Sequence, residues 1–340
     1  MRGLALMRKI SLRHLRCFLA IAETGSFTLA AARLFHTQSS LTATIQQFEE
    51  AIGMKLFDRT TRRVMLTDDA ERFKVVAERI LRDFDNAIGD LRAVAQSQRG
   101  HVRIAAAPSM IVHVLAPALA RFRRAYPQIT ISVRDGGSDK IERSVLDGEV
   151  DFGISSRLNN YSELDYVPML TDPFGVVFPR DHPLARTAGP VAWSELKSYE
   201  CIVLTKDTGI GALLDSYPEL GLRDGLELHD HASSTTALYA MLGLGGKVSV
   251  LPALAARAAP LAEFRFRELS APRLSREICL ITRHLRSFSV NTQRILSVLM
   301  ATLKEIDLNG AEVILNEQWS GDETEAPADC RFDVSQLVES

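Results

Sequence analysis

The chain has 340 residues, of which 46% are hydrophobic and 24% are charged, and its formal net charge is −2. This length indicates two or more domains, and the composition is ordinary for a globular protein. No apolar run approaches the ~18 residues that a membrane span needs, and the apolar stretch after Met1 is too short for a secretory signal. Four widely spaced cysteines without a CxxC pair indicate free thiols. We therefore expect a cytoplasmic protein without a membrane partner.

The charge is distributed unevenly along the chain. Residues 1–66 carry ten Lys and Arg against four Asp and Glu, whereas residues 304–340 carry two against ten. A basic head is typical of a domain that binds a polyanion such as double-stranded DNA. The acidic end has the composition of a solvated tail.

Three short helices are predicted near the start of the chain. The first covers residues 11–22. The second covers 27–34 after the cap residue Ser26, and the third covers 38–51 after Thr37. Their apolar residues recur with helical spacing, and Ser and Thr commonly cap helix N-termini. Two short helices joined by a tight turn, with a polar outer face on the second, form the helix-turn-helix plan.

The third helix has an apolar and a polar face. Leu41, Ile45 and Phe48 recur at i, i+4 and i+7 and are expected to face inward. The outer face is small, neutral and rich in hydroxyl and amide groups. Such groups can contact base edges and phosphates in a major groove.

A small hairpin is expected at residues 56–66, with arginines at its tip. Arginines on a protruding wing can contact phosphates or a minor groove, and the alternative is a solvated charged turn. The full set of candidate DNA-binding residues is Ser26, Arg33, Thr37, Gln38, Ser39, Ser40, Thr42, Ala43, Gln46, Arg59, Arg62 and Arg63.

A long helix is predicted after Thr67. Its apolar residues follow alternating steps of three and four, at Ala70, Phe73, Ala77, Ile80, Phe84, Ala87, Leu91 and Val94. This heptad seam is typical of a helix that pairs with a second chain. The alternative is an amphipathic helix packed on its own domain. A homodimer or homotetramer is therefore expected.

Strands and helices alternate after residue 100. The first five elements are expected at 102–106, 110–125, 129–133, 139–146 and 151–154. Further strands are expected at 174–178, 201–204, 226–229, 248–251, 264–267 and 279–282, before a last helix at 291–306. This order predicts parallel sheets in a two-lobed α/β sensor that is periplasmic-binding-protein-like, with a cleft beyond the strand ends.

Four parts of the chain are expected from these elements. They are a winged helix-turn-helix domain at 10–67, a linker helix at 68–96, an effector-binding domain at 100–306 and an acidic tail at 307–340. The first lobe of the effector-binding domain covers about 100–172 and 273–306, and the second covers about 173–272.

Polar residues at strand-to-helix junctions are the candidates for effector binding. They are Ser109, Ser138, Thr205, Ser234 and Thr235, together with the nearby Lys247. Hydroxyls and helix N-termini suit a carboxylate, so a small, anionic organic effector is expected. For each hydroxyl the alternative is an ordinary helix cap, and for Lys247 it is a position in solvent.

Other chemistry is weakly indicated. Glu227, His229 and His231 alternate as on one face of a strand, but no fourth ligand has a matching spacing, so no metal site is predicted. Nucleophile, phosphate-loop and zincin motifs are missing from the sequence, and neither a cofactor nor catalysis is expected.

About 57 residues of the head resemble the opening of the LysR family of bacterial transcription regulators. The matching runs are 15–31, 37–42, 48–49, 53–59 and 63–67, and looser landmarks follow at 119–127, 147–154, 181–184 and 250–252. Ser39 stands where the family usually has proline, Ala43, Gln46 and Gln47 where it often has basic residues, and Lys247 where it usually has a small residue.

The resemblance implies a linker helix that dimerises the heads and an effector site between two lobes. The sequence therefore predicts a DNA-binding transcription regulator controlled by a small molecule. The alternative is a solute-binding or enzymatic α/β protein with an appended helical head.

Overall fold

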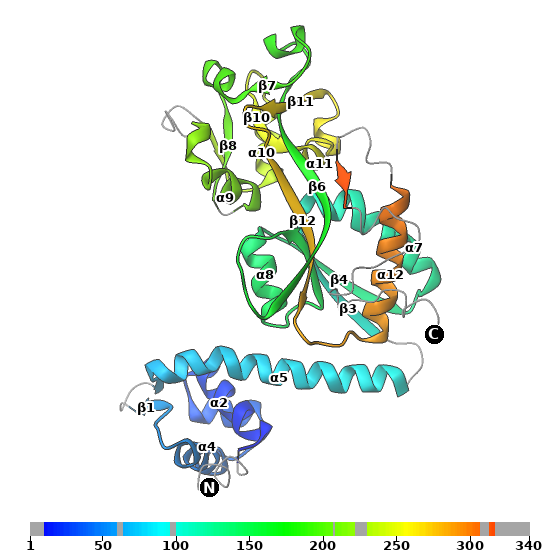
Figure 1. The fold of residues 1–340 in the computed structure, drawn as a ribbon. Coiled ribbons are helices and arrows are strands. Elements are labelled where there is room, and N and C mark those ends of the chain that lie inside the picture. The colour runs from blue at the N-terminus through cyan, green and yellow to red at the C-terminus, as the bar shows by residue number, and fades with distance from the viewer. Residues whose placement is uncertain are drawn as a thin grey trace. The chain divides into compact units, whose positions relative to one another are not determined.

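The computed structural model describes residues 10–59, 64–95, 100–206, 208–221, 230–306 and 313–316. They belong to two compact units, Met1–Gln96 and Ser97–Ser340 (Figure 1). Each unit has its own hydrophobic core, and each is described by itself.

The first unit is a helical head followed by a hairpin and a long helix. Its elements are α2 (Leu12–Thr24), α3 (Phe27–Arg33), α4 (Gln38–Ile52), β1 (Phe57–Arg59), β2 (Val64–Leu66) and α5 (Asp68–Ala95). Gly25 and Gly53 end α2 and α4 with φ of +62° and +76°, a conformation that glycine adopts without steric cost. The strands β1 and β2 pair antiparallel. Arg62 and Arg63, predicted at the tip of this wing, lie outside the described residues.

Aromatic rings form the core of the head. The Phe18 ring lies 6.4 Å from that of Phe48, 5.6 Å from that of Phe57 and 5.4 Å from that of Phe73, measured between centroids. These rings come from α2, α4, β1 and α5. Burying them removes a large apolar area from water and fixes the start of α5 on the head.

The seam of α5 is divided between two environments. Ala70, Ala77 and Leu81 are buried in the head core, and Phe73 packs against it. The prediction that the whole seam faces a second chain is therefore wrong for its first part, because the head itself covers those residues. Ile80 and Phe84, one turn apart on α5, are 41% and 40% exposed, so the described residues leave this apolar strip partly uncovered.

The second unit is built on a mixed sheet. Within the described residues its strands are ordered β4-β3-β5-β12-β6-β11-β7, and β10 and β13 also pair with β6. The strands are β3 (Gly100–Ala106), β4 (Ile129–Asp135), β5 (Phe152–Ser156), β6 (Leu164–Pro179), β7 (Val191–Ala192), β10 (Ser249–Pro252), β11 (Phe264–Ser270), β12 (Ser275–Arg283) and β13 (Ile314–Leu315). A separate parallel pair consists of β8 (Ile202–Leu204) and β9 (Asp230–Ala232).

Helices follow most of these strands. The helices are α6 (Pro108–Met110), the π-helical turn η1 (Ile111–Leu115), α7 (Ala116–Ala125), α8 (Ser138–Leu146), α9 (Gly209–Asp215), α10 (Thr235–Leu242), α11 (Ala253–Ala256) and α12 (Val290–Glu305). Among the described residues, short 3-10 turns lie at η2 (Pro183–Arg186), η3 (Trp193–Ser198), η4 (Pro218–Leu220) and η6 (Ala259–Leu261). Residues of α7 and α12 pack in one core of the sheet, and residues of α8 pack in another.

The strand β6 belongs to both lobes of the second unit (Figure 1). Its first part pairs with β12 as far as Pro173, and its second part pairs with β10 and β11 from Phe174 onward. The sequence predicted only residues 174–178 as a strand here. It also predicted a strand at 226–229, which lies outside the described residues, directly before β9.

Each lobe has a hydrophobic cluster. The first is built on β3, β5, η1, α7 and α12, and the second on the later part of β6, β8, α10 and β10. Ala253 and Leu254 of α11, expected in the second lobe, are buried in the first cluster, and Phe266 packs against both. The apolar packing is therefore continuous between the lobes at α11.

A buried carboxylate holds the wing to the end of α4. Glu49 is 3% exposed and accepts hydrogen bonds from Lys55 Nζ at 2.8 Å and from the Leu56 N–H at 3.0 Å. Burial by itself raises the pKa of the Glu49 carboxyl, but the hydrogen bonds outweigh it and hold this pKa below its ordinary value.

Replacing Glu49 by Gln is expected to destabilise the head by about 1–3 kcal/mol at pH 7, because a charge-assisted pair is lost. A lowered pKa in the folded state contributes stability above the unfolded pKa of about 4.3, and this contribution is lost as the pH falls below it. The difference between the wild type and Glu49→Gln is thus expected to be larger at pH 7 than at pH 4 in calorimetry of the full chain. The exposed neighbour Glu50→Gln is the control. An equal difference at both pH values would contradict this role.

Candidate DNA-binding surface and effector cleft

The outer face of α4 is exposed and uncharged along its first three turns. Ser39, Ala43 and Gln46 are exposed and Thr42 is half-buried. Leu41, Ile45 and Phe48 are buried on the opposite face, so the inward face predicted from the sequence is confirmed. Side chains on this outer face are free to approach a base edge.

Two of the predicted DNA-binding hydroxyls cap helices. Ser26 Oγ accepts the Leu29 N–H at the start of α3, and Thr37 Oγ1 accepts the Ser40 N–H at 3.2 Å at the start of α4. Gln38 Oε1 accepts the Thr28 hydroxyl at 3.2 Å. These contacts fix α4 on α3, which positions the outer face of α4.

Arginines flank the start of α4. Arg13 of α2 is exposed and donates to Ser40 Oγ at 3.2 Å, and the sequence did not single it out. Arg33 forms an ion pair with Glu23. Only the contact across the fold reveals Arg13, because its position in α2 resembles that of any solvent-facing charge.

Two helices of the first lobe begin without a side-chain cap. The residues before them are Ala107 for α6 and Gly137 for α8, and neither can accept a hydrogen bond through its side chain. Ser109 and Ser138 follow the carboxyl ends of neighbouring strands, β3 and β4. Neither is a helix cap, so that alternative is wrong for both, and their hydroxyls bond elsewhere.

Ser109 is joined to a buried ion pair. Its Oγ accepts from Arg276 Nη2 at 2.8 Å, and Arg276 donates to Asp172 Oδ2 from Nε at 3.0 Å and from Nη2 at 2.7 Å. Arg276 is 6% exposed and Asp172 is fully buried. These three bonds use Nε and Nη2, so Nη1 is not engaged in them. Sequence reasoning missed Arg276, because a charged residue near the start of a strand gives no sign of a distant partner.

Ser138 meets the second lobe. Its Oγ lies 2.9 Å from Ser155 Oγ, and a Cβ added at Gly209 would lie 2.9 Å from Ser138 Oγ and 3.2 Å from its backbone N. Gly209 is the first residue of α9, which Thr208 caps, and Thr208 Oγ1 donates to the Thr205 carbonyl oxygen at 2.9 Å. The absence of a side chain at Gly209 allows the two lobes to meet here.

The other candidates in the second lobe differ in their environment. Ser234 Oγ accepts the Ala237 N–H at 3.1 Å, so Ser234 is the helix cap of α10, which was the alternative to effector binding. Tyr239, one turn after Thr235 on α10, donates to the Ala255 carbonyl oxygen at 3.0 Å, and burial raises the pKa of Tyr239 although Arg276 and Thr235 act to lower it.

Lys247 is held by carboxylates. Its Nζ lies 2.8 Å from Asp230 Oδ2 and 3.3 Å from Glu200 Oε2, and the hydrogen bond that it donates to Asp230 contributes most to raising its pKa. Its charge is already paired by two acids, which disfavours a role in binding an anionic effector.

The cysteines described by the structure are buried thiols. Burial raises the pKa of Cys201 to about 11, and burial together with Glu277 raises that of Cys279 to about 12. Cys17 is buried as well, and burial raises its pKa. Glu227 and His229 lie outside the described residues, and within those residues no group of three His, Cys, Asp or Glu could hold a metal ion.

Comparison with known proteins assigns both units. Residues 12–71 match the family model of the bacterial regulatory helix-turn-helix protein, lysR family, and residues 95–304 match that of the LysR substrate binding domain. The chain belongs to the LysR family. It is 32% identical over 295 residues to the uncharacterized HTH-type transcriptional regulator YbhD of Escherichia coli (strain K12), covering 86% of this chain and 92% of that protein.

Solved structures of low identity share the fold. Full-length CbnR complexed with its target DNA has a TM-score of 0.59 at 22% identity, covering 86% of this chain and 100% of that chain. The effector binding domain of QuiR in complex with shikimate has a TM-score of 0.50 at 18% identity, covering 61% of this chain and 99% of that chain.

This LysR-family chain is a DNA-binding transcription regulator with an effector-binding domain, and it is not an enzyme. The alternative of a solute-binding or enzymatic protein is set aside, because the match covers the head as well as the sensor. Among the residues that the structure describes, no helix combines the length and apolar character needed to cross a bilayer.

Proposed function

We propose that this regulator is a cytoplasmic protein that binds promoter DNA as a homodimer or homotetramer and responds to a small organic anion held between the lobes of its sensor. In this proposal residues 10–67 bind DNA, 68–96 dimerise the heads and 100–306 bind the effector. The observation that carries the effector part is the pair of first-lobe helices, α6 and α8, that begin at one edge of the sheet without a side-chain cap.

The outer face of α4 is proposed to read the major groove. It offers the hydroxyl of Thr42 and the amide of Gln46, with no charge between them, so it is suited to base edges rather than phosphates. Phosphate contact then requires cations from other elements. Arg13 is one such cation, because its guanidinium reaches Ser40 at the start of α4.

Replacing Arg13 by Ala is expected to weaken binding to specific and non-specific DNA alike. One lost phosphate contact lowers the slope of log K against log salt by about 0.9. Gel-shift or anisotropy titrations over a salt series would measure this. Arg16→Ala is a matched control on the same helix, because Arg16 pairs with Asp85 of α5 at 2.9 Å. A slope that changes equally in both variants would remove Arg13 from the interface.

The exposed part of the α5 seam is proposed to pair with a second chain. Ile80 and Phe84 lie one turn apart on α5 and each is about 40% exposed, and apolar side chains in such a strip gain most by packing on a like helix.

Phe84→Asp is expected to dissociate the oligomer, since it would place an unpaired charge in the seam. Sedimentation velocity would show a smaller species, and DNA affinity would fall. Val75→Asp is the control, because Val75 is 55% exposed and lies about 180° around the helix from Phe84. If Phe84→Asp sediments like the wild type, the strip does not mediate assembly.

The effector site is proposed at the edge of the first-lobe sheet, with Arg276 beneath it. Uncapped N–H groups at two helix starts carry partial positive charge and suit a carboxylate. Ser109, Ser138, Thr205 and Thr235 are proposed to surround it, whereas Ser234 and Lys247 are engaged in a cap and in ion pairs. QuiR, which shares the fold, was solved with shikimate, and this supports an organic acid. An effector that prefers one arrangement of the lobes would shift the sensor toward it.

Ser109→Ala is expected to lower effector affinity by about 0.5–1.5 kcal/mol, as for one neutral hydrogen bond. A panel of small organic acids that includes shikimate would first be screened by thermal shift, and calorimetry would then give the affinities. Ser234→Ala is the control, because it removes a hydroxyl that serves as a cap. DNA affinity without effector should be unchanged in Ser109→Ala. Equal effector affinity in Ser109→Ala and the wild type would exclude Ser109 as a contact.

A further inference from the structure

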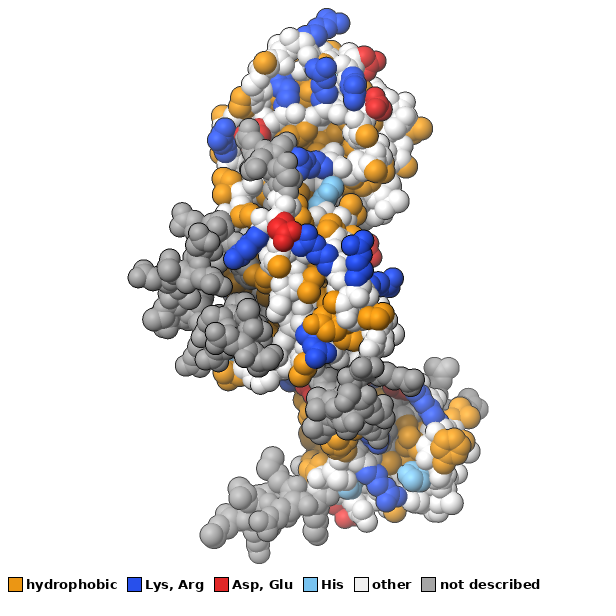
Figure 2. All heavy atoms as spheres, turned by 90° about the vertical axis from the view of Figure 1, so that its right-hand side faces the viewer, with side chains coloured by type: hydrophobic (Ala, Val, Ile, Leu, Met, Phe, Trp, Pro, Cys, Tyr) orange, Lys and Arg blue, Asp and Glu red, His pale blue; other side chains and the backbone are white. Residues whose placement is uncertain are grey.

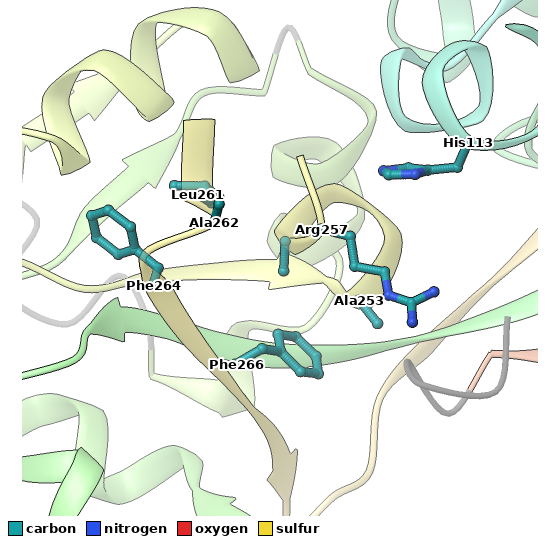
Figure 3. A pocket seen from close by; sticks show the side chains of 8 residues that line it. His113, Ala253, Arg257, Leu261, Ala262, Phe264 and Phe266 are labelled. Atoms are coloured by element: carbon teal, nitrogen blue, oxygen red, sulfur yellow. The ribbon is translucent and has the colours of Figure 1, made fainter. Parts of the chain in front are cut away.

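A groove of about 500 Å³ lies at the junction of the two lobes, and none of the predicted effector residues lines it. Its walls come from η1, α11, η6 and β11 (Figure 3). The lining residues are His113, Ala253, Ala256, Arg257, Leu261, Ala262, Phe264 and Phe266. This volume is within the usual range of small-molecule sites, about 300–1,000 Å³.

Most of the lining is apolar. Phe264 and Phe266 alternate along β11, so both rings face the same side of the strand, and both are half-buried. The position of Phe266 depends on Gly175 of β6, since a Cβ at Gly175 would lie 2.4 Å from the Phe266 ring. Such a surface suits a flat or aliphatic hydrocarbon body.

One cation stands in this apolar setting. Arg257 is exposed at the end of α11, and its guanidinium forms no ion pair with the described residues. No described residue of the lining is acidic. Figure 2 shows one face of the molecule, and on its second unit Lys and Arg are more frequent than Asp and Glu. Charge complementarity therefore favours an anion.

The second polar group of the groove is His113. Its pKa is below the ordinary value, mainly because of burial and further because of the nearby Arg257. A hydrogen bond with the Leu254 backbone and the charge of Asp172 act to raise it. The lowered pKa favours the neutral imidazole, so Arg257 is the permanent charge among the described lining residues. Figure 3 shows Arg257 and His113 extending toward the same space.

A local irregularity places His113 there. His113 lies in the π-helical turn η1, which interrupts the helix between α6 and α7. π-Helical turns are rare in proteins as a whole, but those that occur are frequently found at functional sites. His113 follows the first-lobe strand β3, whereas Arg257 follows the second-lobe strand β10, so a ligand touching both would contact both lobes.

We propose that this groove is a second ligand site, which binds a small apolar monocarboxylic acid. Arg257 holds the carboxylate, His113 offers a neutral hydrogen-bonding group, and the rings of Phe264 and Phe266 contact the hydrocarbon body. The site is separate from the cleft proposed for the effector, and it does not require that cleft to bind anything.

Calorimetry of the full chain with benzoate tests the proposal. Benzoate is expected to bind the wild type, and the neutral isostere benzamide is expected to bind at least tenfold more weakly. Arg257→Gln should weaken benzoate binding at least tenfold. Arg265→Gln is the matched control, because Arg265 is exposed on the same strand but alternates to the face opposite Phe264 and Phe266. Its affinity should stay within twofold of the wild type.

Two further variants separate the sites. Ala262→Phe should abolish benzoate binding by filling the groove without changing its charge. Ser109→Ala should leave benzoate affinity unchanged, so failure of the proposed effector cleft would not affect this result. The proposal is overturned if benzoate does not bind, if Arg257→Gln and Ala262→Phe bind it like the wild type, or if only Ser109→Ala weakens it, since benzoate would then occupy the cleft.

Discussion

The pair of Arg276 and Asp172 is the contact on which the sensor depends. The two residues face each other in register on β12 and β6, next to the point where β6 passes from one lobe to the other. Asp172 also accepts the Leu254 N–H of α11 at 3.0 Å. Removing one partner of such a buried pair typically costs about 3–5 kcal/mol, because an unpaired charge is left behind. The pair thus joins the hinge strands, the second-lobe helix and, through Ser109, the start of α6.

This arrangement places different chemistry on different parts of the hinge. Beyond the strand ends are helix starts without side-chain caps, hydroxyls and the close approach of Ser138 to Gly209. At α11 the packing is apolar and continuous between the lobes, with Phe266 touching both cores. Because interiors are tightly packed, a change in the lobes must repack the contacts at α11 as well as those at the strand ends.

Local patterns allowed much of the fold to be predicted, and contacts across the chain account for what was missed. The helices of the head and their inward faces follow from apolar spacing at Leu41, Ile45 and Phe48. The part of β6 that pairs with β12 contains Pro168 and Pro173, which disfavour a strand in single-sequence reasoning. The sequence predicted one continuous seam along α5, whereas the head covers its first part. The spacing of apolar residues reveals an apolar face but not whether the head or a second chain covers it. The roles of Arg276 and Arg13 depend on hydrogen-bond partners that lie 104 and 27 residues away in the sequence, so local patterns could not reveal them.

The buried thiols have a kinetic consequence. Peroxides and alkylating reagents react with the thiolate, and a thiol with a pKa of about 11, as at Cys201, is ionised at pH 7 in roughly one molecule in ten thousand. For Cys279 the fraction is smaller still. These two positions are also enclosed by the cores of the sensor. Oxidants would therefore reach them on the timescale of local unfolding, and mild oxidation of the folded sensor should leave both sulfurs unmodified.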